Sequence, residues 1–537
     1  MKKNLAYNKI DIVRDLKEMV VHNSKKFGEK PAFEYASKDG KISKSYIQLE
    51  KDVFALGSYF YSIGMKDAKI ILYSENSYEW VVTYLAAVCG GNTIVPLDKE
   101  LKPAEAAVLV RACGAEMIVH SKKKAALLDE FEEGEIKASL CLDDFATACE
   151  KGAEDTSEFA AHEIDVEKCC SIIYTSGTTG NPKGVMLCQR NLVCNMIRAM
   201  ETLKFPVGTP EKPLSTLAVL PFNHTFGMMA CVLCQIHSGV TVYINAGLKY
   251  VLADINIAKP GHISVVPLFV ESFYKGIWKN AKKSGKDKLL KVMIKVSNAL
   301  RKVGIDLRRK LFKSVLDAFG GNLEMIIAGG APMPDELIKG FDDIGVQVIN
   351  GYGISECSPI VSINRHCWSK MGSVGQVINT VQAKTINNNE DGEGEICVKG
   401  DIVMMGYYEN PEANAAAFTE DGWFNTGDIG KVDEDNFIYI TGRKKNLIIL
   451  ENGKNVYPEE LEYLIGKNVA GVAEVVVYAK DSLITAEIFA EEDADKEKIE
   501  NDIKNVLNPT IAQYKRIHTV KFRDTEFEKT TTKKIKR

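Results

Sequence analysis

Two hydrophobic patterns alternate along residues 1 to about 440. Stretches with apolar residues at helical spacing are separated by short runs rich in β-branched residues, among them KIILYS, EMIVHS, LAVLPF, HISVVP and EMIIAGG. Strands that alternate with helices are typical of βαβ units, in which neighbouring strands run parallel. The pattern therefore predicts an α/β fold with largely parallel sheet over this part of the chain.

The pattern changes after Gly394. Short strands and turns, GEICVKG and FIYITGR, come before an amphipathic helix at YPEELEYLI. We expect a small β-barrel-like lobe followed by a small α+β domain. The predicted boundary gives an N-terminal domain of residues 1–444 and a C-terminal domain of residues 445–537. The run EEDADKEKIENDIK is predicted to be a solvated loop that leads into a helix.

Length and composition narrow the class of protein. A chain of 537 residues exceeds one hydrophobic core, so several lobes are expected. The formal charge of -4 gives no whole-chain reason to expect nucleic acid as a partner. The apolar stretch WVVTYLAAVCGGNTIVPL is interrupted by Gly90, Gly91 and Asn92, which predicts a helix, a turn and a strand instead of a membrane span. Scattered cysteines and a polar N-terminus favour a reduced, cytoplasmic setting.

The stretch YTSGTTGNPKG, residues 174–184, concentrates hydroxyls and free backbone amides. Glycine lets a backbone amide approach an anion where a Cβ would obstruct it, and hydroxyls add further donors. The stretch lacks the Walker pattern because Gly180 is followed by Asn181 and Pro182 instead of lysine. A flexible turn is the alternative for this loop taken alone. The candidate phosphate-binding residues are Thr175, Ser176, Gly177, Thr178, Thr179, Gly180 and Lys183.

Further stretches follow in a fixed order: LPFNHTFG (220–227), GGAPM (329–333), NGYGISE (350–356), GEICVKG (394–400), GWFNTGD (422–428), YITGRKKN (439–446) and the terminal KKIKR. Together with the hydroxyl-rich loop, they resemble the adenylate-forming superfamily, which includes acyl-CoA synthetases, adenylation domains of peptide synthetases and beetle luciferases. The resemblance spans nearly the whole chain. It implies ATP and Mg²⁺ as cofactors, with coenzyme A as co-substrate.

The resemblance assigns roles to residues of the nucleotide site. Glu356 matches the glutamate that holds magnesium, and Ser355 matches the hydroxyl residue beside the α-phosphate. Asp428 matches the carboxylate that accepts the ribose hydroxyls, and Arg443 matches the residue that reaches ribose or phosphate. Without the resemblance, Glu356 would be interpreted as a surface cap and Asp428 as a turn residue. Adenine and phosphate contacts are further assigned to Tyr352, Gly353, Gly330 and Ala331.

The last part of the chain carries the expected mobile elements. Lys445 matches the family hinge, about which the small domain would rotate between two half-reactions. Lys534 matches the lysine that spans the substrate carboxylate and the α-phosphate, and Lys533 is the alternative amine. Gly453 is assigned to contact with the thiol or pantetheine. A frayed basic tail is the alternative for KKIKR.

The segment after LPFN indicates the kind of acid. His224 matches the histidine beside the carboxylate pocket, and Phe226, Met228 and Met229 begin an apolar stripe. Relatives that activate amino acids usually carry an aspartate here, so its absence favours an uncharged acyl chain. A simply buried helix is the alternative. Cys231 and Cys234 form a CxxC without nearby His ligands, which gives little support for a metal or redox role.

Residues 275–319 are strongly basic, with fourteen Lys or Arg against three Asp. Apolar residues recur between the cations at helical spacing, and the segment resembles the helical insert of long-chain fatty acyl-CoA synthetases. A solvated helix packed by one stripe is expected here, with a peripheral membrane contact as the alternative, because a basic amphipathic helix can lie on anionic lipid.

The sequence predicts an AMP-forming acyl-CoA synthetase for a medium- or long-chain fatty acid. Transfer to an acyl carrier protein in place of coenzyme A, and activation of an aryl acid, are the enzyme alternatives. A nucleotide-dependent fatty-acid-binding protein without turnover is the alternative from another class.

Overall fold

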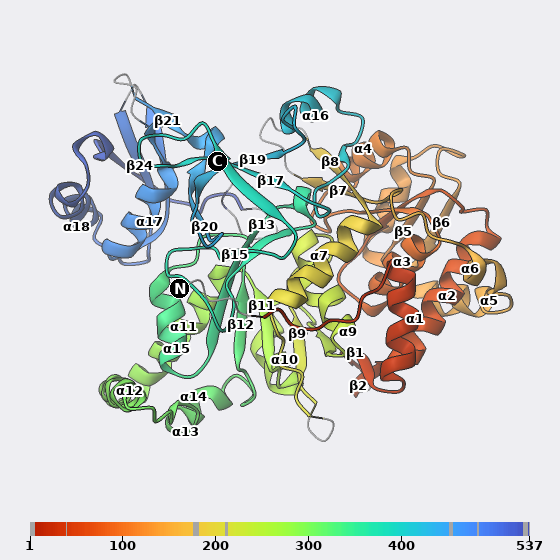
Figure 1. The fold of residues 1–537 in the computed structure, drawn as a ribbon, viewed down its shortest axis with the longest axis horizontal. Coiled ribbons are helices and arrows are strands. Elements are labelled where there is room, and N and C mark those ends of the chain that lie inside the picture. The colour runs from red at the N-terminus through yellow and green to blue at the C-terminus, as the bar shows by residue number, and fades with distance from the viewer. Residues whose placement is uncertain are drawn as a thin grey trace. The chain divides into compact units, whose positions relative to one another are not determined.

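The computed structural model describes residues 6–38, 40–175, 182–209, 213–450, 455–480, 483–529 and 535. Contacts divide the chain into two compact units (Figure 1). The first contains Met1–Gln382 and Lys399–Ala416, and the second contains Ala383–Val398 and Ala417–Arg537. A mobile domain that begins at residue 445 stays a prediction, because compactness alone does not locate a hinge.

The first unit contains a nine-stranded sheet whose central strands run parallel. Its strands, in spatial order, are β15 (Gln376–Val377), β14 (Ile360–Ile363), β13 (Gln347–Gly353), β12 (Met325–Ala328), β11 (His262–Val265), β9 (Ser215–Ala218), β10 (Thr241–Ile244), β1 (Pro31–Ser37) and β2 (Gly40–Ser45). The strands from β13 to β1 pair in parallel, whereas β2, β14 and β15 pair antiparallel at the two edges. The prediction of βαβ units is confirmed for this sheet.

A seven-stranded sheet in the same unit has a parallel part and an antiparallel edge. Its order is β18 (Gly406–Tyr407), β8 (Lys183–Cys188), β7 (Cys169–Thr175), β4 (Thr93–Pro96), β3 (Lys69–Tyr73), β5 (Met117–His120) and β6 (Ala138–Cys141). The strands from β7 to β6 pair in parallel, and β7, β8 and β18 pair antiparallel. The antiparallel edge therefore brings residues 406–407 beside the hairpin that carries the hydroxyl-rich loop.

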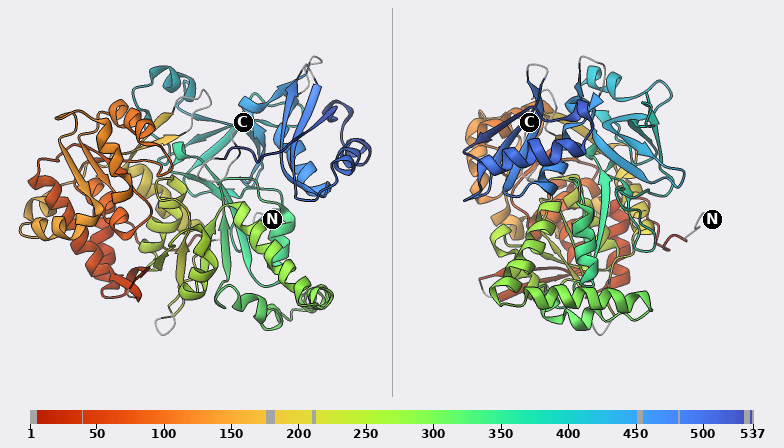
Figure 2. Two further views of the ribbon diagram at one scale, coloured as in Figure 1. Left: turned by 180° about the vertical axis from the view of Figure 1, so that it is seen from behind. Right: turned by 90° about the vertical axis from the view of Figure 1, so that its left-hand side faces the viewer.

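Helices cover both sheets, as Figures 1 and 2 show. Three of the N-terminal helices begin at a side-chain cap, because Asp15, Ser45 and Ser77 each accept a backbone N–H three residues ahead. The helices of this half are α1 (Leu16–Phe27), α2 (Tyr46–Ser62), α3 (Tyr78–Cys89), α4 (Pro103–Cys113), α5 (Phe145–Gly152), α6 (Ser157–Ala161) and α7 (Gln189–Thr202).

The apolar stretch that could have suggested a membrane span folds as α3, a turn at Gly90–Asn92 and the buried strand β4, as predicted. In the part of the chain that the structure describes, no helix has both the length and the apolar composition needed to cross a bilayer.

The basic segment forms helices at one extremity of the first unit, drawn in green in Figures 1 and 2. They are α11 (Pro267–Lys283), α12 (Asp287–Lys302), α13 (Arg308–Leu311) and α14 (Lys313–Asp317). Together with α10 (Val251–Ala258) and α15 (Asp335–Asp343), they pack against the nine-stranded sheet over one hydrophobic core, which includes Phe273, Leu290 and Phe341. The segment is thus part of the folded core and is not a separate arm.

Among the described residues, the second unit contains three sheets. One has the order β16 (Gln382–Ile386), β17 (Gly394–Lys399), β19 (Phe424–Val432) and β20 (Ile438–Arg443). Among the described residues β16 and β20 are its free edges, so the predicted barrel-like lobe is wrong and the lobe is an open four-stranded sheet. Four strands with short connections cannot close upon themselves as eight strands can.

The remaining elements of this unit form the predicted small α+β fold. The hairpin of β21 (Ile448–Ile449) and β22 (Asn455–Val456) leads into α17 (Pro458–Asn468). A three-stranded sheet follows, with β23 (Val472–Lys480) and β25 (Thr519–Arg523) on either side of β24 (Leu483–Ala490), and α18 (Lys496–Asn501) lies between β24 and β25 in the chain. Leu461, Ile465 and Ile488 are fully buried in its core.

Candidate active site

The two ends of the hydroxyl-rich loop are adjacent. Strands β7 and β8 form an antiparallel hairpin in which Thr175 is opposite Lys183, and the Thr175 hydroxyl donates to the Lys183 carbonyl at 3.5 Å. Both side chains are partly exposed. The remaining predicted phosphate-binding residues, Ser176, Gly177, Thr178, Thr179 and Gly180, lie outside the described residues. The hairpin therefore places the loop at the end of a rigid pair of strands.

Three other predicted stretches meet at one edge of the nine-stranded sheet. Gly329, Gly330 and Ala331 follow β12, Tyr352 and Gly353 end β13, and His224 comes shortly after β9. Because β9, β12 and β13 belong to one parallel array, their carboxyl ends lie along the same edge, where open α/β sheets bind ligands. The parallel sheet therefore brings these three motifs close together, although they are far apart in the sequence.

Two glycines at this edge are required by close backbone contacts. A Cβ on Gly353 would lie 2.2 Å from the Pro359 carbonyl oxygen, and one on Gly227 would lie 1.9 Å from the Pro221 carbonyl oxygen. Separations below 3 Å cannot be relieved by moving a side chain, since both obstacles are backbone atoms. The GYG and TFG turns are therefore fixed in shape, which holds the residues that follow them.

Glu356 interacts with a residue that the sequence did not single out. It lies in the short 3₁₀ helix η5 (Ser355–Cys357), and Tyr407 donates its phenol hydrogen to Glu356 Oε1 at 3.0 Å. The Lys183 ammonium lies 4.9 Å from the centre of the Tyr407 ring. Burial, reinforced by the adjacent carboxylate, raises the pKa of Tyr407 well above its ordinary value, so the phenol stays a donor. Tyr407 therefore joins the loop hairpin to the carboxylate.

Tyr407 has no motif around it that indicates a polar role. It follows Gly406 in MMGYYENPE, within the two-residue strand β18 that pairs with β8. The pair of tyrosines beside a glycine is the one local signal, but it does not say which of Tyr407 and Tyr408 faces the site. That choice depends on the antiparallel register of Tyr407 with Val185.

Ser355 also has a partner from a distant part of the chain. Its hydroxyl lies 3.2 Å from the Thr225 hydroxyl, which belongs to α8 (Thr225–Met228). The two hydroxyls share one hydrogen bond, and each retains acceptor capacity for another donor. The contact links the turn after β13 to the helix after His224.

An apolar pocket, partly open to solvent, adjoins these turns. At one end it is lined by glycines of the β12 and β13 turns and by Tyr352, and elsewhere by the aliphatic and aromatic residues Leu203, Phe205, Phe226, Ala230, Cys234, Ile327 and Ile360. No charged side chain is among the described residues that line it. Its lining suits an uncharged hydrocarbon chain.

Residues of the helix after His224 line two different cavities. Phe226, Ala230 and Cys234 line the large pocket, whereas His224, Met228 and Met229 line a smaller cavity with Tyr84 and Phe222. A π-helical segment, η3 (Met229–Leu233), interrupts the helical phase before α9 (Cys234–His237). The three residues that line the large pocket are four positions apart, so they lie on one face of the helix, and this spacing is the signal that could have identified Ala230 and Cys234.

In the second unit, Asp428 and Arg443 form an ion pair. They are opposite each other in the β19–β20 ladder, and Arg443 Nε lies 2.7 Å from Asp428 Oδ1. The Asp428 side chain is 3% exposed, whereas that of Arg443 is 41% exposed. A neighbouring pair has the same form, with Lys444 Nζ 2.6 Å from the buried Glu395 carboxylate. The cations of the two ion pairs, Arg443 and Lys444, are therefore neighbours in the sequence, and each is paired with a buried carboxylate from another part of the sheet.

The predicted hinge residue, Lys445, lies in the 3₁₀ turn η6 (Lys444–Asn446), directly after β20, and its side chain is exposed. Gly453, Lys533 and Lys534 lie outside the described residues. Their predicted roles in thiol contact and catalysis stay predictions.

The described residues contain no group of three or more His, Cys, Asp or Glu side chains that could hold a metal ion by themselves. Burial raises the pKa values of Cys231 and Cys234 to about 12, so both thiols remain protonated near neutral pH.

Comparison with known proteins identifies the family. A family model described as AMP-binding enzyme matches residues 20–408. The long-chain-fatty-acid–CoA ligase FadD15 of Mycobacterium bovis is 32% identical over 420 residues, which cover 73% of this chain and 68% of the relative. A chloroplastic long-chain-fatty-acid–[acyl-carrier-protein] ligase of Arabidopsis thaliana, AEE15, is 27% identical over 86% of this chain and 74% of its own.

Solved structures share the fold. ATP-bound MatB from Rhodopseudomonas palustris superposes with a TM-score of 0.78 at 23% identity and covers 97% of both chains. A Mycobacterium tuberculosis fatty acyl CoA synthetase gives a TM-score of 0.68 at 22% identity, with 97% of this chain and 96% of its own covered. The glycine turns, the carboxylate of Glu356 and the match over residues 20–408 agree: this chain belongs to the family of AMP-binding enzymes.

Proposed function

We propose that this protein activates a medium- or long-chain fatty acid with ATP and transfers the acyl group to coenzyme A. The observation that carries the proposal is the apolar pocket whose glycine-lined end lies at the turns that hold Tyr352, Gly353 and Glu356. An acid whose chain fills this pocket would present its carboxylate at those turns. The similarity to long-chain-fatty-acid–CoA ligases supports the same substrate class.

In the first half-reaction, a carboxylate oxygen of the acid attacks the α-phosphorus of ATP, a phosphorus–oxygen bond breaks, and pyrophosphate leaves. Two anions must approach each other, so the protein has to supply positive charge and oriented donors. Lys183, the hydroxyls of Thr225 and Ser355, and the loop amides are the groups of the first unit that we assign to this task. Lys534 is proposed to neutralise the meeting anions. Catalysis then consists of positioning and electrostatics.

The residues present fit a magnesium ion that binds together with the phosphates of ATP. Mg²⁺ commonly takes one or two protein carboxylates, with phosphate oxygens and waters completing its shell. Glu356 supplies one carboxylate, which Tyr407 orients through a hydrogen bond of 3.0 Å. The described residues contain no group of three or more possible metal ligands, so phosphates and waters would complete the shell. When bound there, the ion would neutralise charge on the phosphates. Glu356 would hold it, and Tyr407 would fix the carboxylate rotamer.

In the second half-reaction, the thiol sulfur attacks the acyl carbonyl carbon, AMP leaves, and the thiol proton passes to solvent. We propose that rotation about Lys445 withdraws Lys534 and admits the thiol, with Gly453 near the pantetheine. A carrier-protein thiol is the competing acceptor, favoured by the similarity to the acyl-carrier-protein ligase. Thioester formation measured separately with coenzyme A and with purified acyl carrier protein distinguishes the two acceptors.

The test of the function is acid-dependent exchange of pyrophosphate into ATP. The acids should range from acetate to stearate and include benzoates and amino acids. We expect exchange with the longer fatty acids and little with the others, because burying an apolar chain drives binding in an uncharged pocket. Preference for benzoates would favour an aryl-acid ligase, and no exchange with any acid would favour a binding protein without turnover.

Lys534→Ala tests the assignment of the catalytic cation. We expect the exchange rate to fall about a hundredfold or more, while thioester formation from preformed acyl adenylate largely survives. Lys533→Ala is the matched control and should retain exchange. Equal damage to both half-reactions in Lys534→Ala would contradict its role.

A further inference from the structure

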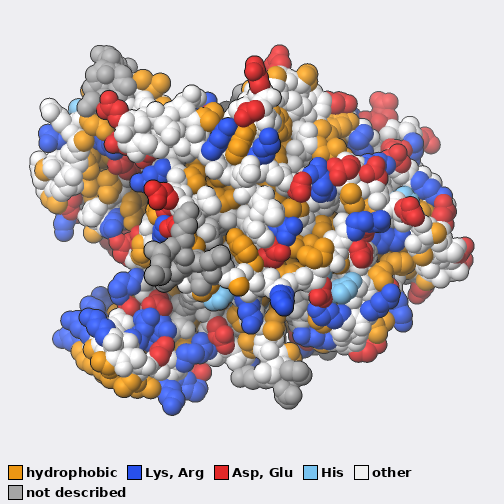
Figure 3. Space-filling model, in the orientation of Figure 1, with side chains coloured by type: hydrophobic (Ala, Val, Ile, Leu, Met, Phe, Trp, Pro, Cys, Tyr) orange, Lys and Arg blue, Asp and Glu red, His pale blue; other side chains and the backbone are white. Residues whose placement is uncertain are grey.

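The basic helices of the first unit carry an apolar stripe on their outer side. Figure 3 shows Lys and Arg side chains gathered over α12–α14, with hydrophobic side chains along the rim. On α12 the exposed fractions are 55% for Leu289, 56% for Val292 and 50% for Val296, and Val303 at the end of the helix is 72% exposed. Spacings of three, four and seven residues place these four side chains on one helical face.

This stripe is distinct from the face that packs on the core. Leu290 and Ser297 are buried, and Met293 and Ile294 contact the hydrophobic core beneath α12. The helix therefore has two apolar faces, of which the fold uses one. From Leu289 to Val303 the outer stripe extends about 21 Å at 1.5 Å per residue.

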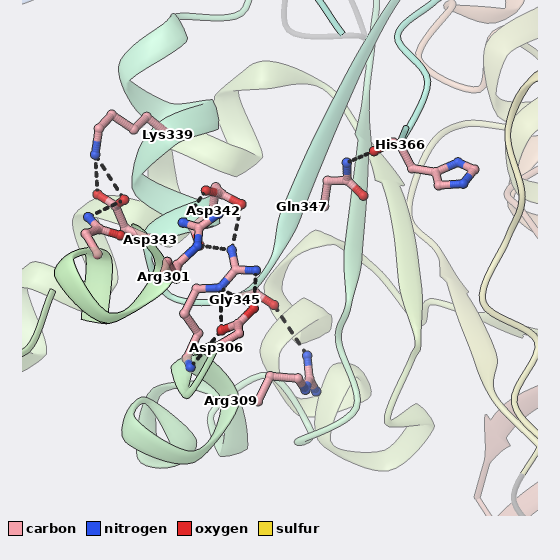
Figure 4. Close-up of polar contacts among 11 residues, drawn as sticks. Arg301, Asp306, Arg309, Lys339, Asp342, Asp343, Gly345, Gln347 and His366 are labelled. Carbon is pink, nitrogen blue, oxygen red and sulfur yellow. Dashed lines mark hydrogen bonds and ion pairs between the residues drawn. The ribbon is translucent and has the colours of Figure 1, made fainter. Parts of the chain in front are cut away.

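The arginines of this region are used inside the fold. Arg301 Nη1 lies 2.8 Å from Asp342, and Arg308 Nη1 lies 2.7 Å from the same carboxylate. Figure 4 shows these contacts among α12, α13 and α15, together with Arg309, which donates to the Gly345 carbonyl at 3.5 Å. Arg308 and Arg309 each donate to several acceptors and Arg301 donates to Asp342, so the planar guanidinium groups fix the helices to one another.

Other polar contacts of Figure 4 stabilise the same packing. Lys339 Nζ lies 2.7 Å from Asp343, which also accepts from Asn298 of α12 at 2.9 Å. Gln347, at the start of β13, donates to the His366 carbonyl at 3.2 Å. The outer face of α12 therefore belongs to a helix that is held in place.

The lysines of α12 are arranged differently. Lys288, Lys291, Lys295 and Lys302 run along one flank of the apolar stripe, and all four are exposed. In the described part of the chain, no carboxylate forms an ion pair with any of them. Long flexible lysine stems can lie against an apolar surface while their ammonium groups reach outward. Lys291 Nζ lies 5.9 Å from the centre of the Trp278 ring, so its stem already rests on an aromatic surface. The fold thus uses Arg301 and Arg308 in ion pairs and leaves these lysine ammonium groups without a carboxylate partner among the described residues.

We propose that the outer face of α12 docks on an anionic lipid bilayer, with the apolar stripe inserted at the level of the headgroups and the flanking lysines on the lipid phosphates. Charge complementarity favours this occupant, since residues 275–319 carry an excess of eleven positive charges in a chain of net charge -4. An acidic protein, such as an acyl carrier protein, would be matched by the lysines but would not require four exposed aliphatic side chains in a row.

The test is co-sedimentation of the full chain with vesicles of phosphatidylcholine alone or mixed with phosphatidylglycerol. Each lysine near an anionic surface contributes roughly fivefold to binding, so Lys291→Gln with Lys295→Gln should weaken binding more than tenfold. Val292→Glu with Val296→Glu should abolish it. We expect weaker binding to pure phosphatidylcholine and at high salt.

Matched controls are available elsewhere on the surface. Val108→Glu changes a valine that is 63% exposed on α4, and Lys25→Gln with Lys51→Gln removes two exposed lysines from α1 and α2. These variants should bind vesicles like the parent chain. Thermal melting and pyrophosphate exchange without lipid establish that each variant is folded. If the glutamate pair melts early, Val292→Ser with Val296→Ser replaces it.

A direct measurement of depth completes the test. Leu289→Trp places a fluorophore in the stripe, and its emission should shift to the blue and be quenched by brominated lipid. Three results would overturn the proposal: no binding to anionic vesicles, binding that needs the lysines but not the valines, or binding to purified acyl carrier protein with none to vesicles. Because co-sedimentation does not depend on turnover, failure here is distinguishable from failure of the proposed enzyme activity.

Discussion

Tyr407 donates its phenol hydrogen to Glu356 across 3.0 Å, and the Lys183 ammonium lies over the Tyr407 ring at 4.9 Å. One side chain thus contacts both the hairpin that carries the hydroxyl-rich loop and the carboxylate assigned to magnesium. The phenol cannot serve as a base, because its pKa is raised well above the ordinary value. Its role is to position Glu356.

Tyr407→Phe tests this role because it keeps the ring under Lys183 and removes only the hydroxyl. A hydrogen bond to a charged group contributes about 1.5–3 kcal/mol, so we expect acid activation to fall about tenfold to a hundredfold. The Mg²⁺ concentration for half-maximal pyrophosphate exchange should rise, whereas a purely structural role would lower the melting temperature and leave the magnesium dependence unchanged.

Tyr408→Phe is the matched control. Tyr408 donates to the Cys113 carbonyl at 3.4 Å and does not contact Glu356. It should retain the parent magnesium dependence. The double variant Tyr407→Phe with Glu356→Gln should lose no more activity than Glu356→Gln alone, since the tyrosine acts through the glutamate.

Asp428→Asn should raise the KM for ATP about tenfold or more, because the neutral amide accepts ribose hydroxyls less strongly than the carboxylate. The KM for the fatty acid should change little. Kinetics with each substrate varied in turn provide the measurement.

Glu395→Gln separates nucleotide binding from stability. Glu395 is a buried carboxylate paired with Lys444 at 2.6 Å, in the same sheet as the Asp428–Arg443 pair. Both substitutions should lower the melting temperature to a similar extent, but only the one at Asp428 should affect the KM for ATP. An equal effect of both on that KM would contradict a ribose contact at Asp428.

Ala230→Val should shift the acid preference toward shorter chains. Ala230 is 5% exposed and lines the large apolar pocket, so two added methyl groups occupy space that the acyl chain would fill. One methylene changes discrimination by about 10- to 200-fold, and the longest acids should lose most of their kcat/KM. The measurement is the exchange rate as a function of chain length.

Met228→Leu tests the other cavity. Met228 lines the smaller cavity with His224, and Leu conserves its volume approximately. The chain-length profile should be unchanged. If this variant alters the profile and Ala230→Val does not, the acyl chain occupies the smaller cavity.

His262 should make stability depend on pH. It is fully buried beside Phe205, with ring centroids 5.1 Å apart, and burial lowers its pKa from 6.5 to about 3. Its Nε2 lies 2.7 Å from Gln235 Oε1, and Gln235 donates its amide to the Ala230 carbonyl at 2.7 Å. The glutamine oxygen therefore accepts, and the neutral imidazole carries its hydrogen on Nε2.

The folded state binds a proton at His262 less tightly than the unfolded state does. Above about pH 6.5 the imidazole is neutral in both states, so it does not change the free energy of unfolding. Between about pH 6.5 and pH 3 it lowers the unfolding free energy by about 1.4 kcal/mol for each unit of falling pH. His262→Gln should remove that component. The check is the difference between the two unfolding curves as a function of pH, and parallel curves would contradict the buried neutral state.

The alternation of apolar patterns determined most of the elements. KIILYS, EMIVHS and HISVVP form β3, β5 and β11, and YPEELEYLI forms α17. These elements could be predicted because the spacing of apolar residues along a strand or helix follows the face that it buries. The open sheet of β16, β17, β19 and β20 was mistaken for a barrel-like lobe. Closure depends on whether the edge strands meet, and no local pattern contains that information.

The candidate site divides in the same way. The sequence alone indicated the hydroxyl-rich loop and the glycine turns as candidates, since each needs particular residue types within a few positions of one another, and the family resemblance added Glu356. Only the tertiary structure decided that Tyr407 meets Glu356, that Ala230 and Cys234 line the large pocket, and that Arg301 and Arg308 pair with Asp342 while the lysines of α12 have no carboxylate partner among the described residues. The physical reason is that strand register and the packing of one element on another are set by contacts between segments distant in the chain, and the partners of a side chain follow from them.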